Sequence, residues 1–489
     1  MGHKKLAEPD KNQLLFEKGL LFAIWLFSAL FMLLVVFRYT VNISLFMPYF
    51  KWGAVLLIVA ALLYILITKL KYPQTTYRIK NFFIGMKSYE QWFMIALFVW
   101  FAIVCLVRGI IDQTNYFRIA DWWLLDSAVS ALLFYPLTYF FSRANKMKAI
   151  DTILHIVALS YTLFSAWCLW HVFHLNVITL PSGSQVGLTE HFELWLGCHY
   201  NLTGALAFTI LAIACYMIFV KKTAWKIIYG IVAFIQLYIS LLSNSRTVFI
   251  CVLFLGAACA FLLGLNIAKK KKTIPKLIIS SLMAAVCVFI LWKMRSATFA
   301  LFDAVTNFRE LVSSQAESVE DTVRDLAGLS GREAIWIGAL KAMVSSPEAF
   351  FFGVTPFTTP SFLRTYGGLS FDPAHAHNII LQLGVSMGVP AMIAFIVFLI
   401  IICYKCIRLV FKTKGEDFNR YGMIAIVITS LILMNMAEAY LVSYYAIMSS
   451  VFFLACGSIT YSGQTAKLTR YDLDSGKLKN KTIIFDANA

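Results

Sequence analysis

Residues 247–267 read TVFICVLFLGAACAFLLGLNI and contain no charged side chain, and a lysine tract follows at 269–272. An apolar run of about 17–25 residues is what an α-helix needs to cross the hydrocarbon core of a bilayer, which is roughly 30 Å thick. Lysines at the end of such a run are attracted to anionic lipid head groups. The stretch therefore predicts a membrane-spanning helix that ends at a charged membrane surface.

Apolar runs of this length recur along the whole chain. Of its 489 residues, 60% are hydrophobic and 14% are charged, whereas soluble domains are about 45–50% apolar and about a quarter charged. The first run lacks a small-residue cleavage site, so we expect a retained helix rather than a removed signal peptide. We predict an all-α polytopic membrane protein with about twelve transmembrane helices, near residues 19–37, 50–68, 89–107, 122–141, 149–170, 204–220, 227–242, 247–267, 277–294, 377–404, 421–440 and 443–460.

Positive charge is distributed unevenly between the two sides of the predicted membrane. Alternate loops, counted from the N-terminus, contain 30 of the 42 lysines and arginines. Because basic loops stay in the cytoplasm, both termini are predicted to be cytoplasmic. The net charge of +17 is then a topology signal. The basic residues lie in short loops between spans, which argues against binding of nucleic acid.

Two loops on the outer side are long, at about 171–203 and 295–376. The second is the only predicted loop able to form an extracytoplasmic subdomain, with an amphipathic helix over 300–327. A second helix is marked by Ser330 and Glu333, which have the spacing of a capping box, and it stops before Pro347. The expected organisation is a cytoplasmic N-terminus, helices one to nine, this helical loop, helices ten to twelve and a cytoplasmic tail, at 1–18, 19–294, 295–376, 377–460 and 461–489.

Two arginines occupy helix starts on the outer side. Arg246 follows Ser245 in the turn between spans seven and eight, where an arginine must face water, lipid phosphate or a partner. Arg332 is at the second position of the capped loop helix, where a cation is unfavourable unless an anion is also present. Free backbone N–H groups at both places favour negative charge. We interpret both as anion ligands; the alternatives are an interfacial Arg246 and an ordinary salt bridge for Arg332.

The stretch AHAHNIILQLGVSMGVPA, residues 374–391, places His377 and Asn378 at the start of span ten. Histidine is the side chain that can accept and return a proton near neutral pH. Asp372 lies five residues upstream and could orient the imidazole. The alternative is that the histidine serves only as a hydrogen-bonding helix cap.

No cofactor or metal is predicted. A metal centre needs three or four ligands in a defined geometry and a supporting second shell. The pair His171 and His174 has no carboxylate motif nearby, and the Cys403-x-x-Cys406 sequence has no second pair. Two further histidines of the same outer loop, His191 and His199, do not change this expectation.

Taken together, the two arginines could hold a pyrophosphate, and His377 could take a proton from an attacking hydroxyl. Such a set suits transfer from a diphosphate-activated lipid donor to an alcohol on the outer leaflet. The sequence contains no Walker motif, no Rossmann fingerprint and no D-x-D motif, so a soluble nucleotide sugar is not expected as the donor.

Three motifs make the sequence similar to the bacterial O-antigen ligase and O-antigen polymerase superfamily, and the resemblance covers most of the chain. SNSRT resembles the family's Ser-Arg-Thr segment and places Arg246 at its arginine. SGREAIW resembles its Gly-Arg-x-x-x-Trp segment and places Arg332 at the second. HNIILQLGVSMG is similar to the ligase signature of His-Asn, nine residues and Gly, which gives His377, Asn378 and Gly388. Ala391 departs from it, because the signature continues with Gly, Thr or Tyr at that position.

The resemblance implies a GT-C-like, metal-independent, inverting glycosyltransferase of the bacterial inner membrane, with its active site on the extracytoplasmic face. The donor would be a polyprenyl-diphosphate-linked oligosaccharide, and the acceptor a glycan or lipid. Arg246 and Arg332 would bind the pyrophosphate, and His377 would orient or deprotonate the acceptor hydroxyl. Other polysaccharide-assembly proteins would be its partners. The remaining candidates for substrate contacts are Ser245, Asn201, Asn378 and Asp372.

Two alternatives stay open. A ligase would transfer the glycan to lipid A core and a polymerase to another lipid-linked repeat; the departure at Ala391 favours the polymerase. The competing class is a transporter or flippase with twelve spans. Against it, the long loop is off-centre and no six-plus-six repeat is visible. The charged residues within spans are few, chiefly Asp126, Asp151 and Glu438, whereas transporters bind their substrates near the membrane midplane.

Overall fold

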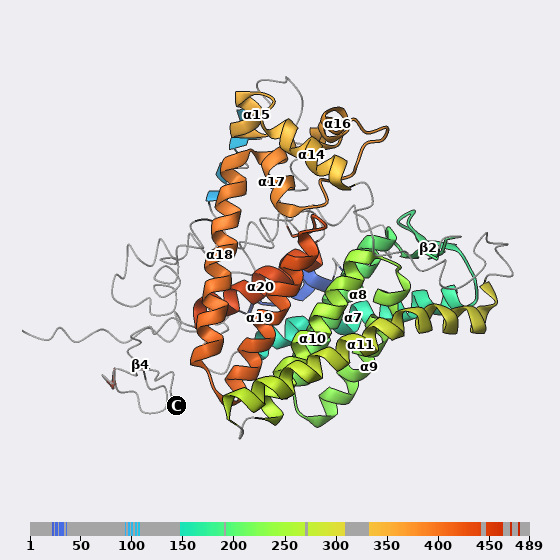
Figure 1. Cartoon of the computed structure of the whole chain (residues 1–489), viewed down its shortest axis with the longest axis vertical. Helices are drawn as coiled ribbons and strands as arrows, with labels where there is room; N and C mark the ends of the chain where they lie inside the picture. The colour runs from blue at the N-terminus through green and yellow to red at the C-terminus, as the bar shows by residue number, and fades with distance from the viewer. Residues whose placement is uncertain are drawn as a thin grey trace, which may run out of the picture.

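The structure is a computed structural model, and it describes residues 147–189, 192–268, 272–308, 332–441 and 446–462, two short pairs in the tail, and separate positions within 22–36 and 93–107. Long helices form a bundle, and four shorter helices gather at one end of it (Figure 1). The described helices are α7 (Met147–Phe173), α8 (Tyr200–Val220), α9 (Thr223–Leu242), α10 (Arg246–Ile267), α11 (Thr273–Thr306), α14 (Arg332–Met343), α15 (Pro347–Phe352), α16 (Thr355–Gly367), α17 (Ile379–Met387), α18 (Val389–Lys412), α19 (Gly415–Asn435) and α20 (Ala446–Ser462).

Within the described residues, seven helices are long and apolar enough to cross a membrane: α7, α8, α9, α10, α11, α18 and α19. The apolar part of α20, Ile447–Thr460, is shorter. The class of an all-α polytopic membrane protein is therefore confirmed. Each predicted span from 149–170 onward overlaps at least one described helix, and the span at 377–404 overlaps two. The first four predicted spans are described only at separate positions or not at all, so the total of twelve stays a prediction.

Helix α8 is the most buried of these helices, and it packs against the turn that precedes α10. Its sequence is rich in small residues, which lets neighbouring backbones approach closely. Gly204 faces the turn between α9 and α10, where an added Cβ would lie 2.4 Å from Oγ of Ser243. In the same turn Asn244 has a φ of 57°, a left-handed conformation that asparagine tolerates. The turn aims the N-terminus of α10 towards the shorter helices.

Helix α11 is longer than the sequence predicted. The apolar run suggested an end near residue 294, but the helix continues to Thr306 and ends at Asn307, which has a φ of 52°. At about 1.5 Å per residue, its 34 residues exceed the thickness of the hydrocarbon core. The start of the predicted amphipathic helix over 300–327 is thus a continuation of the membrane helix, and residues 309–331 lie outside the described part.

The loop between α7 and α8, which the sequence predicts to be on the outer side, contains a small antiparallel sheet, and this corrects the all-α expectation locally. Its strands β1 (Ile178–Thr179), β2 (Gln185–Leu188) and β3 (Leu194–Leu196) pair in the order β1-β2-β3. The backbone N–H of Leu196 donates to Oγ1 of Thr203 at 3.2 Å, which ties β3 to the first turn of α8. A second pair, β4 (Arg470–Tyr471) and β5 (Leu478–Lys479), lies in the C-terminal tail.

The four shorter helices α14 to α17 have a small core of their own at the end of the bundle (Figure 1). Its buried side chains include Ile335, Ala339 and Met343 of α14, Leu363 of α16 and Val385 of α17. Helix α14 ends before Pro347, as predicted. Ser330 lies outside the described residues, so its role as a helix cap stays a prediction.

Span ten is broken into α17 and α18, although the sequence predicted one helix over 377–404. The break is at Gly388, whose φ of 86° favours glycine. A Cβ at this position would lie 2.2 Å from the carbonyl oxygen of Phe351. Pro390 then starts the next helix without needing an N–H donor. The glycine of the HN signature therefore serves the close contact between the loop subdomain and the membrane helix.

Candidate active site

Glu438 lies at the centre of a polar cluster at the junction of the bundle and the shorter helices. The sequence placed this residue inside a span, but α19 ends at Asn435 and Glu438 belongs to the following turn. Its side chain is 1% exposed. Nη2 of Arg332 donates to Oε1 of Glu438 at 2.7 Å, and Nδ1 of His377 lies 3.1 Å from Oε2. One carboxylate thus joins the arginine and the histidine that the sequence singled out.

The turn that carries Glu438 is held by side-chain amides. Oδ1 of Asn435 accepts from the backbone N–H groups of Tyr440 and Leu441, at 2.7 and 2.9 Å. Nδ2 of Asn378 donates to the carbonyl oxygen of Met436 at 3.0 Å. The glutamate is therefore fixed relative to the start of α17, so its distance from His377 does not depend on a flexible loop.

His377 has a strained backbone that points its ring to the carboxylate. Its φ is 50°, a conformation that a side chain with a Cβ rarely adopts and that often marks functional sites. Nδ1 of His375 accepts the backbone N–H of His377 at 3.1 Å. Oδ1 of Asn378 caps α17 by accepting from the N–H groups of Ile380 and Leu381. The helix cap is thus Asn378, and His377 is left for another role.

Arg332 connects the cluster to α10. It is the first residue of α14, and its Nη1 donates to Oγ1 of Thr247 at 2.9 Å. Thr247 directly follows Arg246, the first residue of α10. The N-termini of α10 and α14 therefore meet here, and both supply backbone N–H groups that favour an anion.

The charges of the cluster stabilise an ionised carboxylate. Burial alone would raise the pKa of Glu438, but the hydrogen bond from His377 and the positive charges of His377 and Arg332 lower it below its usual value. For His375, burial is the main reason that the pKa falls to about 3; the charges of His377, Arg332 and His199 lower it further, whereas the carboxylate of Glu438 raises it. His375 is therefore a neutral ring at physiological pH.

The geometry fixes the tautomer of His377. An ionised carboxylate has no proton to donate, so the proton between His377 and Glu438 is on Nδ1 of the histidine. In a neutral ring the lone pair is then on Nε2, the nitrogen that faces away from Glu438. This is the arrangement in which a carboxylate orients a histidine that acts as a general base.

Three of these groups have the spacing of metal ligands. Within the described part of the chain, ligand atoms of His375, His377 and Glu438 all lie within 4.8 Å of one another. The hydrogen bonds do not suit a metal, however. With Glu438 ionised, its contact with His377 at 3.1 Å needs a proton on Nδ1 of the histidine. Because Nδ1 of His375 accepts a backbone N–H, the proton of a neutral His375 is on Nε2. Both rings would have to exchange tautomers before they could coordinate an ion.

The expectation that Asp372 orients the imidazole is wrong. Asp372 lies in the exposed loop after α16, where Oδ1 is 3.3 Å from Nε of Arg364. Glu438 has the orienting position instead. It is 61 residues from His377 in the chain and was read as part of a span, so no local pattern connected the two. The sequence feature that points to Glu438 is a carboxylate in an otherwise apolar stretch. Such a residue often marks a functional site in membrane proteins.

The structure places the remaining candidates around this cluster with unequal roles. Arg246 is half-buried at the start of α10, beside Thr247, and Ser245 is the buried residue that precedes it. Both polar atoms of the Asn378 side chain are hydrogen-bonded to backbone groups of the protein. Asn201 is in the first turn of α8, two residues after His199. The charge of His199 influences His375, so the start of α8 is near the site.

Comparison with known proteins agrees with the resemblance that the motifs suggested. Residues 231–396 match the protein family described as O-antigen ligase. The matched segment runs from α9 into α18 and includes Arg246, Arg332 and His377, whereas Glu438 lies beyond it. A search of curated proteins found no match to the chain.

Proposed function

Because residues 231–396 match the family described as O-antigen ligase, we propose that the chain is a membrane glycosyltransferase of cell-envelope polysaccharide synthesis. Its donor is an oligosaccharide linked to a polyprenyl diphosphate. The observation that carries this proposal is the shared carboxylate: Glu438 contacts both Arg332 and His377. One group able to bind phosphate and one able to take a proton are thereby held in the same cluster.

In the proposed reaction, an acceptor hydroxyl attacks the anomeric carbon that is bonded to the diphosphate. Nε2 of His377 accepts the hydroxyl proton as the new glycosidic bond forms. The bond between the anomeric carbon and the diphosphate oxygen breaks, and the electron pair leaves with polyprenyl diphosphate. A single displacement of this kind inverts the anomeric configuration. It needs no metal, because the leaving group is stabilised by cations of the protein.

Arg246 and Arg332 bind the diphosphate in this scheme. Arg332 has five N–H donors, and its hydrogen bonds to Thr247 and Glu438 use one on Nη1 and one on Nη2. The other donors can bind phosphate oxygens bidentately. The N-termini of α10 and α14 add backbone N–H groups where negative charge grows on the leaving oxygen.

The proposal includes the topology predicted from the sequence. Twelve helices with both termini in the cytoplasm would put the cluster on the extracytoplasmic face of a bacterial inner membrane. The loop subdomain that follows the end of α11 at Thr306 would cover it in a GT-C-like arrangement. The predicted boundaries at 18, 376 and 460 belong to the same proposal.

We favour polymerisation over ligation. Ala391 stands where the ligase signature has Gly, Thr or Tyr, and it is a buried residue of α18. The acceptor would then be a second lipid-linked repeat unit rather than lipid A core.

Reconstitution tests the proposal. The purified chain is placed in proteoliposomes with a lipid-linked repeat unit, with and without lipid A core. Extension of the repeat in the absence of lipid A core supports the polymerase, and transfer only to the core supports the ligase. Movement of the intact lipid across the membrane without any new glycosidic bond would instead support the transporter.

A further inference from the structure

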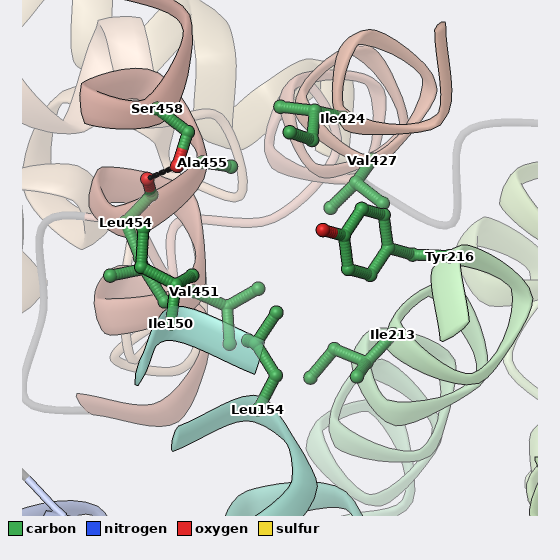
Figure 2. A pocket seen from close by; sticks show the side chains of 10 residues that line it. All are labelled: Ile150, Leu154, Ile213, Tyr216, Ile424, Val427, Val451, Leu454, Ala455 and Ser458. Atoms are coloured by element: carbon green, nitrogen blue, oxygen red, sulfur yellow. Dashed lines mark hydrogen bonds between the residues drawn. The ribbon is translucent and has the colours of Figure 1, made fainter. Parts of the chain in front are cut away.

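A cavity between four helices lies at the end of the bundle that carries the basic loops. It is lined by Ile150 and Leu154 of α7, Ile213 and Tyr216 of α8, Ile424 and Val427 of α19, and Val451, Leu454, Ala455 and Ser458 of α20. Figure 2 shows these side chains pointing into a common space. The empty space between these side chains is about 370 Å³, a volume that includes open solvent at the mouth.

The cavity suits a hydrocarbon chain. Eight of its ten lining residues are aliphatic, and the hydroxyl of Ser458 is turned to the carbonyl oxygen of Leu454 at 2.9 Å (Figure 2). A water needs two to four polar partners to be held in a buried space. The described walls therefore favour an apolar occupant.

Tyr216, in one wall of the cavity, is hydrogen-bonded to a group of charged side chains. The hydroxyl of Tyr216 donates to Oδ1 of Asp151 at 3.0 Å and accepts from Nη1 of Arg420 at 3.0 Å. Nζ of Lys221 lies 2.6 Å from Oδ2 of Asp151. The three charged residues come from α7, the end of α8 and α19, so the apolar space and the charged group share the same helix ends.

This charged group has an excess of positive charge. Asp151 is buried, with a side chain 3% exposed, whereas the side chains of Lys221 and Arg420 are 20% and 21% exposed. One carboxylate cannot neutralise two cations, and the two cations are the members that reach the surface. Both lie at helix ends, where the head groups of a bilayer would lie.

We propose that the cavity binds an acyl chain of an anionic phospholipid, and that Lys221 and Arg420 hold the lipid's phosphate at its mouth. The apolar lining accounts for the chain, and the unbalanced positive charge accounts for the preference for an anionic head group. The site lies at the opposite ends of α8 and α19 from Glu438. It is therefore separate from the proposed active site.

Native mass spectrometry of the purified full chain tests this lipid site. The protein is titrated with phosphatidylglycerol and with phosphatidylcholine that have identical acyl chains. A net excess of one positive charge near a membrane surface predicts a preference of roughly 5-fold for the anionic lipid. Glycerol phosphate, which lacks acyl chains, is expected not to compete. Equal retention of both lipids, or full competition by glycerol phosphate, would overturn the proposal.

Variants separate the two parts of the site. Removing only the cations would leave Asp151 as a buried unpaired charge, so the triple variant D151N/K221Q/R420Q is used. It should lose the preference for the anionic lipid, whereas K412Q, which removes an exposed charge at the same end of the bundle, should keep it. A455F should weaken retention of both lipids because its ring fills the cavity. A preference that survives the triple variant, or that K412Q removes equally, contradicts the lipid site, as does unchanged retention by A455F.

Discussion

Nδ1 of His377 lies 3.1 Å from Oε2 of Glu438, although 61 residues separate them along the chain. The glutamate is buried and is held on its other oxygen by Arg332. This relationship decides which nitrogen of the imidazole can accept a proton. The proposed reaction therefore requires that Glu438 is negatively charged and that it accepts a hydrogen bond from Nδ1 of His377.

Replacing Glu438 by glutamine should reduce turnover by roughly 10²–10⁴-fold, the usual contribution of a correctly oriented base. A glutamine amide can donate to Nδ1 and so favour the tautomer that carries its proton on Nε2. The measurement is kcat for glycan transfer in proteoliposomes. E333Q is the matched control, because Glu333 is exposed on α14 and should keep near wild-type activity. Similar activity of E438Q and E333Q would exclude the orienting role.

Replacing Arg332 by lysine keeps the charge but removes the planar group that contacts Thr247 and Glu438 together. Loss of one charge-assisted hydrogen bond predicts a roughly 10–100-fold fall in kcat/KM. R364K is the control, because Arg364 forms an exposed pair with Asp372. If R364K were as damaging as R332K, the loop ion pair would have to be part of the site.

Stability should decrease as the pH falls from 6.5. The pKa of His375 is lowered to about 3 by burial and by neighbouring charges, so the unfolded chain takes up a proton below pH 6.5 that the folded chain does not. Between pH 6.5 and 5 this removes roughly 2 kcal/mol of folding free energy. The lowered pKa of Glu438 adds a further loss below its ordinary range near 4.5. The pH dependence of the thermal midpoint measures this effect.

The H375Q variant isolates the histidine's part of this pH dependence. It should flatten the profile between pH 6.5 and 5 and leave the loss at lower pH in place. A variant with the same slope as the wild type throughout would show that His375 is not the titrating group.

Alanine at Gly388 should destabilise the junction between the loop subdomain and α18. The position has a φ of 86°, and an added Cβ would lie 2.2 Å from the carbonyl oxygen of Phe351. Left-handed strain and steric overlap together cost roughly 2–5 kcal/mol. Gly368 is a matched control, because it has a φ of 64° but nothing within 4 Å of an added Cβ. G388A should therefore lower the thermal midpoint more than G368A. Equal shifts would show that the close contact with Phe351 does not contribute to stability.

Chelation should not reduce activity, because the proposed reaction uses cations of the protein. Added Zn²⁺ should inhibit instead. Coordination through Nδ1 of His377 would move the ring proton to Nε2 and remove the proposed base. The measurement is the transfer rate in EDTA and across a zinc titration. Loss of activity in EDTA that Mg²⁺ or Mn²⁺ restores would rule out the metal-independent scheme.

The sequence was informative about membrane helices because the length of an apolar run is set by the bilayer. It was less informative about where helices break or continue. The break at Gly388 depends on a contact with Phe351, and the extension of α11 to Thr306 depends on residues that are no longer uniformly apolar. The small sheet before α8 was too short to give a periodic signal.

The candidate site was partly predictable for a related reason. Arg246, Arg332 and His377 are at helix starts, and short motifs mark all three. Glu438 has no motif, and its position in the site depends on the end of α19 at Asn435. Asp372 is near His377 in sequence, but it lies in an exposed loop and pairs with Arg364. In space, Glu438 of the turn after α19 is the carboxylate that contacts His377.

The most direct test of the central claim is to measure polyprenyl diphosphate released from a lipid-linked oligosaccharide, together with the new glycosidic bonds. Proteoliposomes with the wild-type chain should release one polyprenyl diphosphate for each bond formed. The H377Q variant should be at least roughly 100-fold slower. Turnover of H377Q at the wild-type rate, or donor transport without release of polyprenyl diphosphate, would contradict the account.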